Sequence, residues 1–335
     1  MITSKSCEQQ AVVSAPLPAR IIEKGLASDR IVIDTIIHKH CNHLPLYRQS
    51  AMLERVTGLE LSRATLDGWV LKVGQFAHAD DGIGRPYIQA NETPVEVQIQ
   101  EGRGKNHQAY LWQYSRPKAT VVFDFRLGRG REGPRQFLGK FKVCCRQTGM
   151  PPTIKSQDRR SCMRDAGRMR NDALPRRSSS TPQDAVATAI VARIDELFAI
   201  DGEARRQTLS LEARDILRQE QIATAAGVIR QQIEAARSTA LPGGERAKAS
   251  NYTLTLWDRL TRFLEHPALE LSNNLAENSM RPVALGRKNW IHIGSAQAGP
   301  KIAAIRSVVE SCRRLKLPAR AERTSSAISK PCTCA

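Results

Sequence analysis

The sequence predicts an α/β protein in which a short run of strands is flanked by helical regions. Between residues 87 and 125, three β-type segments rich in Val, Ile, Tyr and Phe follow one another. A helix is expected directly after them, at Glu132–Phe141. Helical apolar periodicity dominates residues 31–74 and 181–262, and a further helix is expected at Lys301–Leu315. We therefore expect a sheet-based core with one helical region before it and a larger one after its first strands.

The composition points to a polyanionic partner. The chain has 335 residues, with 51 Lys and Arg against 33 Asp and Glu, so its formal net charge is +18. Such an excess favours nucleic acid as a partner, although a basic surface can also serve solubility alone. No apolar run approaches the roughly 18 residues that span a bilayer, and no signal-peptide core is present, so no membrane association is expected.

The eight cysteines are scattered along the chain. None belongs to a CxxC pair that has a second pair at zinc-site spacing, so no structural zinc is predicted. This usage favours a reducing, cytoplasmic compartment.

The N-terminal region is expected to be a linker followed by helices. Residues 1–30 contain Pro16-Leu17-Pro18 and show no strong period. In residues 31–85, a short helix, a turn and the segment from Ser62 to Trp69 are compatible with a helix-turn-helix. The other interpretation, which we favour, is an ordinary helical hairpin with Trp69 in its core.

The three strands are expected at Tyr87–Ile99, His107–Tyr114 and Thr120–Phe125. Arg129 and Arg131 follow the third strand closely. They could contact phosphates, or they could belong to a solvated loop.

In the stretch from Leu269 to Trp290, the acidic residue Glu277 is followed by several basic residues. Asn274 followed by Glu277 is the pattern of a helix start with a capping box. Alternatively, Glu277 is a metal-binding carboxylate placed beside cations that hold a DNA backbone. Those cations are Arg281, Arg287 and Lys288.

This stretch resembles the C-terminal catalytic motif of the insertion-sequence-66 family of DDE transposases, in which an Asn-Asn turn precedes the third catalytic acid. The similarity continues through Arg281-Pro282 and the segment Gly286–Trp290 to about Pro318. The resemblance implies an RNase H-like core whose Asp, Asp and Glu hold two Mg²⁺ ions for attack on phosphodiesters. It further implies transposon-end DNA as the partner, with self-association and accessory proteins of the same element as further candidates.

The resemblance also exposes a defect at the first acid. The family's Asp-Glu-Thr motif reads Asn91-Glu92-Thr93 here. An amide offers a hard cation a neutral oxygen in place of an anionic one, and the first Asp of a two-metal site normally bridges both ions. Glu92 cannot replace it, because neighbouring residues of a strand point to opposite faces. Glu277 alone of the three acids is retained, as the sole predicted metal ligand.

The second acid is missing from residues 142–180, a segment without helical or strand periodicity. From Cys144 to Ser180 the chain carries nine Lys and Arg against three Asp. Regrouping the possible codons by one base permits Leu-Gln-Thr-Asp-Gly-Tyr-Ala, the family's strand with its second Asp, in which Asp arises at the junction of Gln147 and Thr148. A second family motif reappears in the same way over Cys162–Arg170. These matches indicate a reading-frame shift, so we expect the core's fourth and fifth strands to be absent and the segment to be disordered.

The sequence therefore predicts an α/β, RNase H-like core of the DDE transposase type that is disrupted and catalytically inactive. The alternatives are a non-catalytic protein that binds transposon ends and a pseudogene product that never folds. The expected divisions are a linker with the remnant of an upstream zinc-binding region (1–30), helices that are candidates for DNA binding (31–85), the first half of the core (86–141), the out-of-frame segment (142–180), a helical insertion (181–268), the C-terminal part of the core (269–318) and an aberrant tail (319–335).

Overall fold

The structure is a computed structural model. It describes residues 20–23, 25–77, 87–99, 106–117, 119–130, 132–138, 144–147, 163–164 and 185–318. The predictions for the aberrant tail at 319–335 and for most of the linker at 1–30 lie outside these residues, and so does Arg131.

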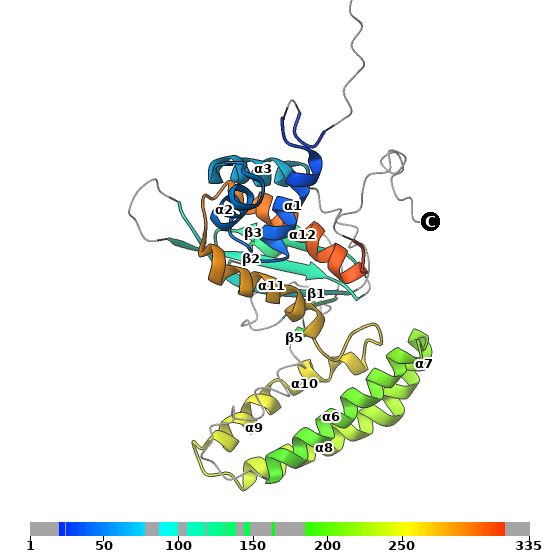
Figure 1. Cartoon of the computed structure of the whole chain (residues 1–335). Coiled ribbons are helices and arrows are strands. Elements are labelled where there is room, and N and C mark those ends of the chain that lie inside the picture. Colours follow the sequence, from blue (N-terminus) through cyan, green and yellow to red (C-terminus); the bar gives the residue numbers. More distant parts are fainter. Residues whose placement is uncertain are drawn as a thin grey trace, which may run out of the picture.

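A mixed sheet forms the centre of the molecule (Figure 1). Its strands follow the order β3-β2-β1-β4-β5, and β6 also pairs with β1. Strand β2 is antiparallel to both β1 and β3, whereas β4 and β6 run parallel to β1. The bounds are β1 (Tyr87–Val97), β2 (His107–Ser115), β3 (Val121–Arg126), β4 (Cys144–Gln147), β5 (Met163–Arg164) and β6 (His292–Ile293). The three predicted strands are therefore confirmed to within two residues at each end.

The prediction that the fourth and fifth strands are absent is wrong. The backbone of Cys144–Gln147 pairs in parallel with Tyr87–Ala90, and the two residues of β5 pair with the end of β4. Ladder hydrogen bonds are made by backbone groups, which every residue except proline can supply in full, so altered side chains do not prevent pairing. The other residues of 142–180 lie outside the described part of the chain.

Helices cover both faces of the sheet. One face packs against α11 (Asn274–Trp290) and α12 (Ala298–Leu315), where Val95 and Val97 of β1 contact a cluster that includes Met280 and Val283. The other face packs against α4 (Glu132–Leu138), with Ile88 and Ala90 in its cluster. Odd-numbered residues of β1 therefore face α11, and even-numbered residues face α4.

Three N-terminal helices lie outside α12. They are α1 (Asp29–His40), α2 (Leu46–Thr57) and α3 (Arg63–Phe76). The Ser62 hydroxyl caps α3 by accepting from the Thr65 N–H at 3.1 Å. Leu66 and Val70 of α3 are buried against Ile305, and Trp69 packs beside this cluster. This packing agrees with the interpretation that places Trp69 in a helical core.

Residues 185–264 form a long helical block that extends away from the sheet (Figure 1). Its elements are α6 (Ala185–Arg206), α7 (Leu211–Leu217), a π-helical turn η1 (Arg218–Ile222), α8 (Ala223–Ser238), α9 (Glu245–Thr255), α10 (Trp257–Leu260) and a 3₁₀ turn η2 (Arg262–Leu264). Ile194, Ile222, Ile229 and Trp257 share one apolar core with Leu269 of the segment that leads to α11.

A buried ion pair connects this block to the segment before α11. The fully buried Arg218 in η1 donates to Asp201 Oδ1 at 2.8 Å. The same guanidinium donates to the carbonyl oxygens of Phe263 and Leu269, at 3.0 and 2.7 Å. Removing Asp201 would leave the buried Arg218 guanidinium without its carboxylate partner, which costs several kcal/mol, ~3–5 in comparable cases.

No helix within the described residues has both the length and the apolar character needed to cross a membrane.

Helix α12 can approach β3 closely because Gly299 has no side chain. A Cβ at this position would lie 2.3 Å from the Phe125 ring, far inside van der Waals contact. We expect Gly299→Ala to lower the free energy of unfolding by about 1–3 kcal/mol through overpacking, measured by chemical denaturation. Gly68→Ala on α3 is the matched control, because a Cβ there meets nothing within 4 Å. An equal loss in both variants would contradict this account of the α12–β3 contact.

Candidate functional site

Helix α11 begins differently from the capping box that the sequence predicts. Its N-cap is Asn273, whose side chain makes no capping hydrogen bond, and its first residue is Asn274. Glu277 is therefore the fourth helical residue, where its N–H donates to the Asn273 carbonyl at 3.0 Å. The capping-box interpretation is wrong, because it requires Asn274 to be the N-cap, whereas Asn274 is already the first residue of the helix.

Two hydrogen bonds fasten the start of α11 to strand β1. Asn273 is fully buried, and its Nδ2 donates to the Ala90 carbonyl at 3.2 Å. One residue away on each segment, Gln89 Nε2 donates to the Ser272 carbonyl at 3.2 Å. The Asn-Asn turn therefore binds the backbone of the strand directly before Asn91.

Asn91 lies on the side of β1 that faces α11, as its odd position on the strand requires. It is half-buried, and its Oδ1 accepts from the Glu92 N–H at 2.8 Å. Its partner across the ladder is Gln113 of β2. The structure therefore brings two predicted site residues, Asn91 and the half-buried Glu277, to the same side of the sheet.

The parallel strand β4 ends beside Asn91. Ala90 is the register partner of Gln147, the last residue of β4. On the same edge of β1, pairing resumes at Glu96, which is the partner of His292 in β6. Asn91 thus lies just past the end of one parallel strand and before the start of another.

Glu92 occupies the opposite face, as strand alternation predicts. Its side chain is 6% exposed and receives a hydrogen bond from Arg129 Nε at 2.7 Å. Its second oxygen, Oε2, has no hydrogen-bond partner in the structure. Burial raises the pKa of Glu92, and the Arg129 hydrogen bond opposes part of that rise. Arg129, a predicted phosphate contact, is thus engaged by a carboxylate.

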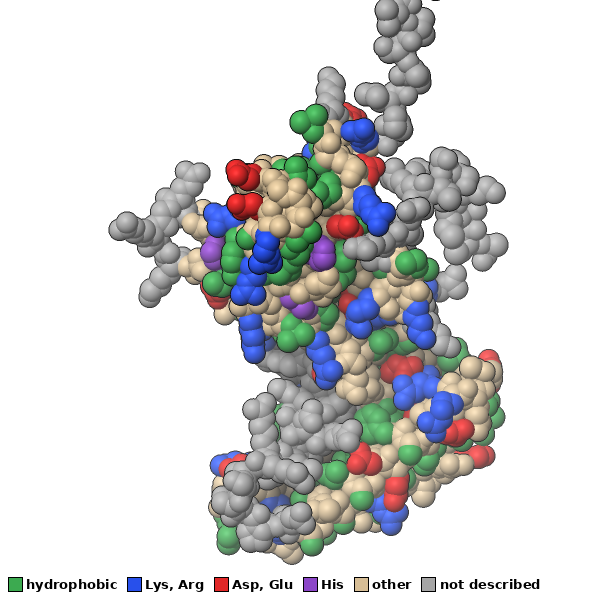
Figure 2. Space-filling model, viewed as in Figure 1, with side chains coloured by type: hydrophobic (Ala, Val, Ile, Leu, Met, Phe, Trp, Pro, Cys, Tyr) green, Lys and Arg blue, Asp and Glu red, His purple; other side chains and the backbone are tan. Residues whose placement is uncertain are grey.

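The three predicted cations of α11 separate into two groups. Arg281 and Lys288 are exposed and form no ion pair with a described residue. They follow Glu277 by four and eleven residues, so Glu277, Arg281 and Lys288 lie on one face of the helix. Arg287 is half-buried instead, and its Nη1 donates to the Pro94 carbonyl of β1. Figure 2 shows basic side chains spread over the visible face of the sheet domain, interspersed with apolar and polar ones.

The donors present do not fit a pair of Mg²⁺ ions. Within the described residues, no group of three or more His, Cys, Asp and Glu could hold a metal. Where the resemblance predicts the three acids, Glu277 supplies one carboxylate, Asn91 supplies a neutral amide, and the described end of β4 is Gln147. Mg²⁺ sites rely on anionic oxygens, and two ions require more charge than one carboxylate provides.

Two residues near this site escaped the sequence analysis. Gln113 is fully buried beside Asn91, and neither atom of its amide has a hydrogen-bond partner in the structure. Arg314 of α12 donates to the Leu275 carbonyl at 3.0 Å and to the Ser279 hydroxyl, and burial lowers its pKa to about 10. A glutamine on the inward face of a predicted strand was a usable signal for the first, whereas no local pattern marked the second.

The attachment of α11 to β1 can be tested with neighbouring asparagines. Asn273→Ala should lower the free energy of unfolding by about 1–3 kcal/mol, because the buried Ala90 carbonyl loses its side-chain donor. Asn274→Ala is the control at an exposed position, with an expected change within about 0.5 kcal/mol. Urea denaturation of both variants measures the difference, and equal effects would refute the assigned role of Asn273.

The environment of Glu92 predicts a specific pH dependence. Its folded-state pKa lies above the ordinary value of 4.5, so the folded protein binds the proton more tightly than the unfolded chain does. The contribution of Glu92 to the free energy of unfolding therefore falls as pH rises from about 4.5 through the raised pKa. Relative to wild type, Glu92→Gln should become more stable across this window, as followed by denaturation at several pH values. The opposite trend would show that the Arg129 ion pair outweighs burial.

Comparison with known proteins identifies a family and two relatives to which the chain is similar. The sequence profile described as "Transposase IS66 family" matches residues 24–301, which is most of the chain. Two relatives from Sinorhizobium fredii (strain NBRC 101917 / NGR234) are the uncharacterized proteins y4jD and y4qI. The chain is 27% identical to y4jD over 335 aligned residues, covering 92% of this chain and 63% of the relative. It is 26% identical to y4qI over 328 residues, covering 91% of this chain and 60% of the relative.

The chain thus spans less than two thirds of the length of these relatives. The family match covers the strands, the helical block and the start of α11 that carry the residues described above. The chain belongs to the IS66 family of transposases.

Proposed function

We propose that this chain is a catalytically inactive transposase that retains affinity for DNA. The observation that carries the proposal is Asn91. It lies on β1 beside the anchored start of α11, on the same side as Glu277, where the family's first catalytic acid is expected. An amide at this position removes a negative charge that a two-metal mechanism needs.

We infer that the sheet is an RNase H-like core. Three adjacent antiparallel strands followed by a helix support this assignment, together with a parallel strand β4 on the far side of β1. The helical block at 185–264 then takes the place of an insertion between the second and third acid positions.

The register of β4 supports a shifted reading frame as the cause of the second loss. Gln147, the last residue of β4, pairs with Ala90, which directly precedes Asn91 in β1. The regrouped codons permit Asp or Asn at the junction of Gln147 and Thr148. The second acid of an intact frame would therefore fall beside the first, as two carboxylates that share metal ions require.

DNA binding is the part of the activity that the present side chains still favour. The formal net charge is +18, and Arg281 and Lys288 are exposed on the same face of α11 as Glu277. Cations without a protein partner can neutralise phosphates at little cost. The ends of the transposon are the proposed target, while self-association, accessory proteins and a cytoplasmic location remain predictions.

The proposal predicts binding without cleavage. The protein should shift duplex DNA in a gel, and it should not nick a supercoiled plasmid that carries the element's ends in Mg²⁺ or Mn²⁺. Asn91→Asp alone should also fail, because the second acid is still missing. A chain with Asp at position 91 and the restored frame over 144–180 should cleave. Metal-dependent cleavage by the present chain would overturn the proposal of inactivity.

Salt dependence identifies the residues that contact phosphates. Replacing Arg281 and Lys288 by Gln should weaken DNA binding and reduce the slope of log K against log salt by roughly two. A matched variant with Arg237→Gln and Lys248→Gln removes the same charge from the helical block and should leave the slope unchanged. Equal effects would point to net charge alone.

A further inference from the structure

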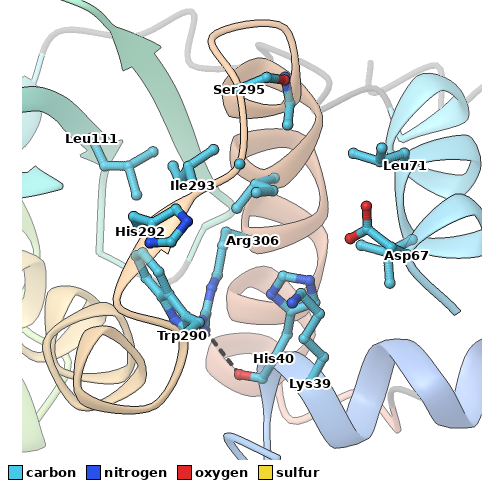
Figure 3. A pocket seen from close by; sticks show the side chains of 14 residues that line it. Lys39, His40, Asp67, Leu71, Leu111, Trp290, His292, Ile293, Ser295 and Arg306 are labelled. Atoms are coloured by element: carbon cyan, nitrogen blue, oxygen red, sulfur yellow. Dashed lines mark hydrogen bonds between the residues drawn. The ribbon is translucent and has the colours of Figure 1, made fainter. Parts of the chain in front are cut away.

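A cavity of ≈ 290 Å³ lies at the far end of α11 from Glu277. It is enclosed by α1, α3, the end of α11, β6 and α12 (Figure 3). None of the residues assigned above to the acid positions lines it. Its volume is near the lower end of known small-ligand pockets, which measure roughly 300–1,000 Å³.

Arg306 of α12 gives this cavity a buried positive charge. The residue is 3% exposed, and its Nη1 donates to the His40 carbonyl at 2.8 Å. It forms no ion pair with any described carboxylate. Glu310, one turn further along α12, is bonded instead to Arg313 at 2.8 Å. A guanidinium offers five N–H donors, so a buried one with a single carbonyl acceptor retains capacity for an anion.

Two further basic side chains line the same end of the cavity. His40 is 2% exposed, and neither of its ring nitrogens has a hydrogen-bond partner in the structure. Lys39 is partly buried beside it, and burial lowers its pKa. In Figure 3 the side chains of Lys39, His40 and Arg306 lie together. Buried polar groups are normally satisfied, so unpartnered ring nitrogens at a cavity mark a place for a polar ligand.

The other walls of the cavity combine an apolar surface, with Trp290 at one edge, and the polar side chains of Asp67, His292 and Ser295. The Asp67 carboxylate acts on Lys39 and opposes the lowering of its pKa. Apolar lining comes from Val70, Leu71, Leu111, Ile293, Ala298 and Ile302. Trp290 and His292 flank Ile291, whose φ of 59° is unusual for a β-branched residue. This backbone turn ends α11 and lets residues on both sides of it line the cavity.

The absence of a side chain at Gly286 makes this arrangement possible. A Cβ there would lie 2.5 Å from Trp290 Nε1 and 3.0 Å from Arg306 Nη2. Any other residue would displace the indole or the guanidinium. The Gly286–Trp290 motif is thus explained by the packing of this cavity, and not by a contact with the acid positions.

We propose that this cavity binds one nucleotide unit, with its phosphate at Arg306, His40 and Lys39 and its base against the apolar wall and Trp290. A buried guanidinium suits a phosphate oxygen pair, and an aromatic edge beside aliphatic side chains suits a planar base. The nucleotide can be a free mononucleotide or one unit of a DNA strand. The second source rests on the proposed affinity for DNA, whereas the first does not.

Binding of a deoxynucleoside 5′-monophosphate and of a short single-stranded oligonucleotide tests the proposal by calorimetry. Tryptophan fluorescence provides a second readout. Arg306→Gln should weaken binding at least about tenfold, the expected effect of losing a charge-assisted hydrogen bond. Arg306-dependent binding of both probes, or of the oligonucleotide alone, supports the proposal and identifies the source. Binding of neither probe by the wild-type protein overturns it, even if duplex DNA is still shifted in a gel.

The controls separate this site from general charge and from misfolding. Arg314→Gln removes a buried arginine from the same helix but outside the cavity, and it should leave the affinity for both probes within about twofold. Ile302→Phe fills part of the cavity while keeping Arg306, and it should weaken binding without removing any charge. Thermal unfolding shows that each variant is folded. Equal losses in the Arg306 and Arg314 variants, or unchanged affinity in a folded Ile302→Phe protein, would overturn the assignment.

Discussion

The hydrogen bond from the buried Asn273 side chain to the Ala90 carbonyl is the constraint on which the rest of the sheet domain depends. It fixes the start of α11 at one point of β1, and the apolar contacts of Met280 and Val283 then align the helix along the strand. Everything that α11 carries is placed by that start. Glu277 comes to lie on the Asn91 side of the sheet, and Trp290 reaches the N-terminal helices. The side chain of the N-cap residue Asn273 thus holds α11 against β1 and does not cap α11 itself.

Dependence on contacts between distant residues explains why the sequence predicted some features and not others. Strand β1 was predicted closely because its β-branched residues alternate in a pattern that needs no tertiary information. The capping box failed because α11 begins at Asn274, so that Asn273 and not Asn274 is the N-cap. Strand β4 was missed because backbone pairing leaves no signature in altered side chains. The separate position of Arg287 could have been predicted, because helical periodicity puts it on a different face of α11 from Arg281 and Lys288.

The helical block has a core of its own, although α10 also contacts β5. This core joins α6, α8 and α10, and the buried charge pair of Asp201 and Arg218 lies within residues 185–264. Arg218 also holds the carbonyls of Phe263 and Leu269, so the block sets the path of the chain into α11.

The two ends of α11 consequently present different chemistry. At its start, Asn91 and Glu277 supply too little negative charge for two metal ions, and this deficit is local to those side chains. At its end, Arg306, His40 and Trp290 line a cavity whose polar groups come from α1, α3, α11, β6 and α12. A change that removes a metal ligand at one end does not alter packing at the other. The proposed loss of catalysis and the proposed nucleotide binding therefore depend on separate parts of this fold.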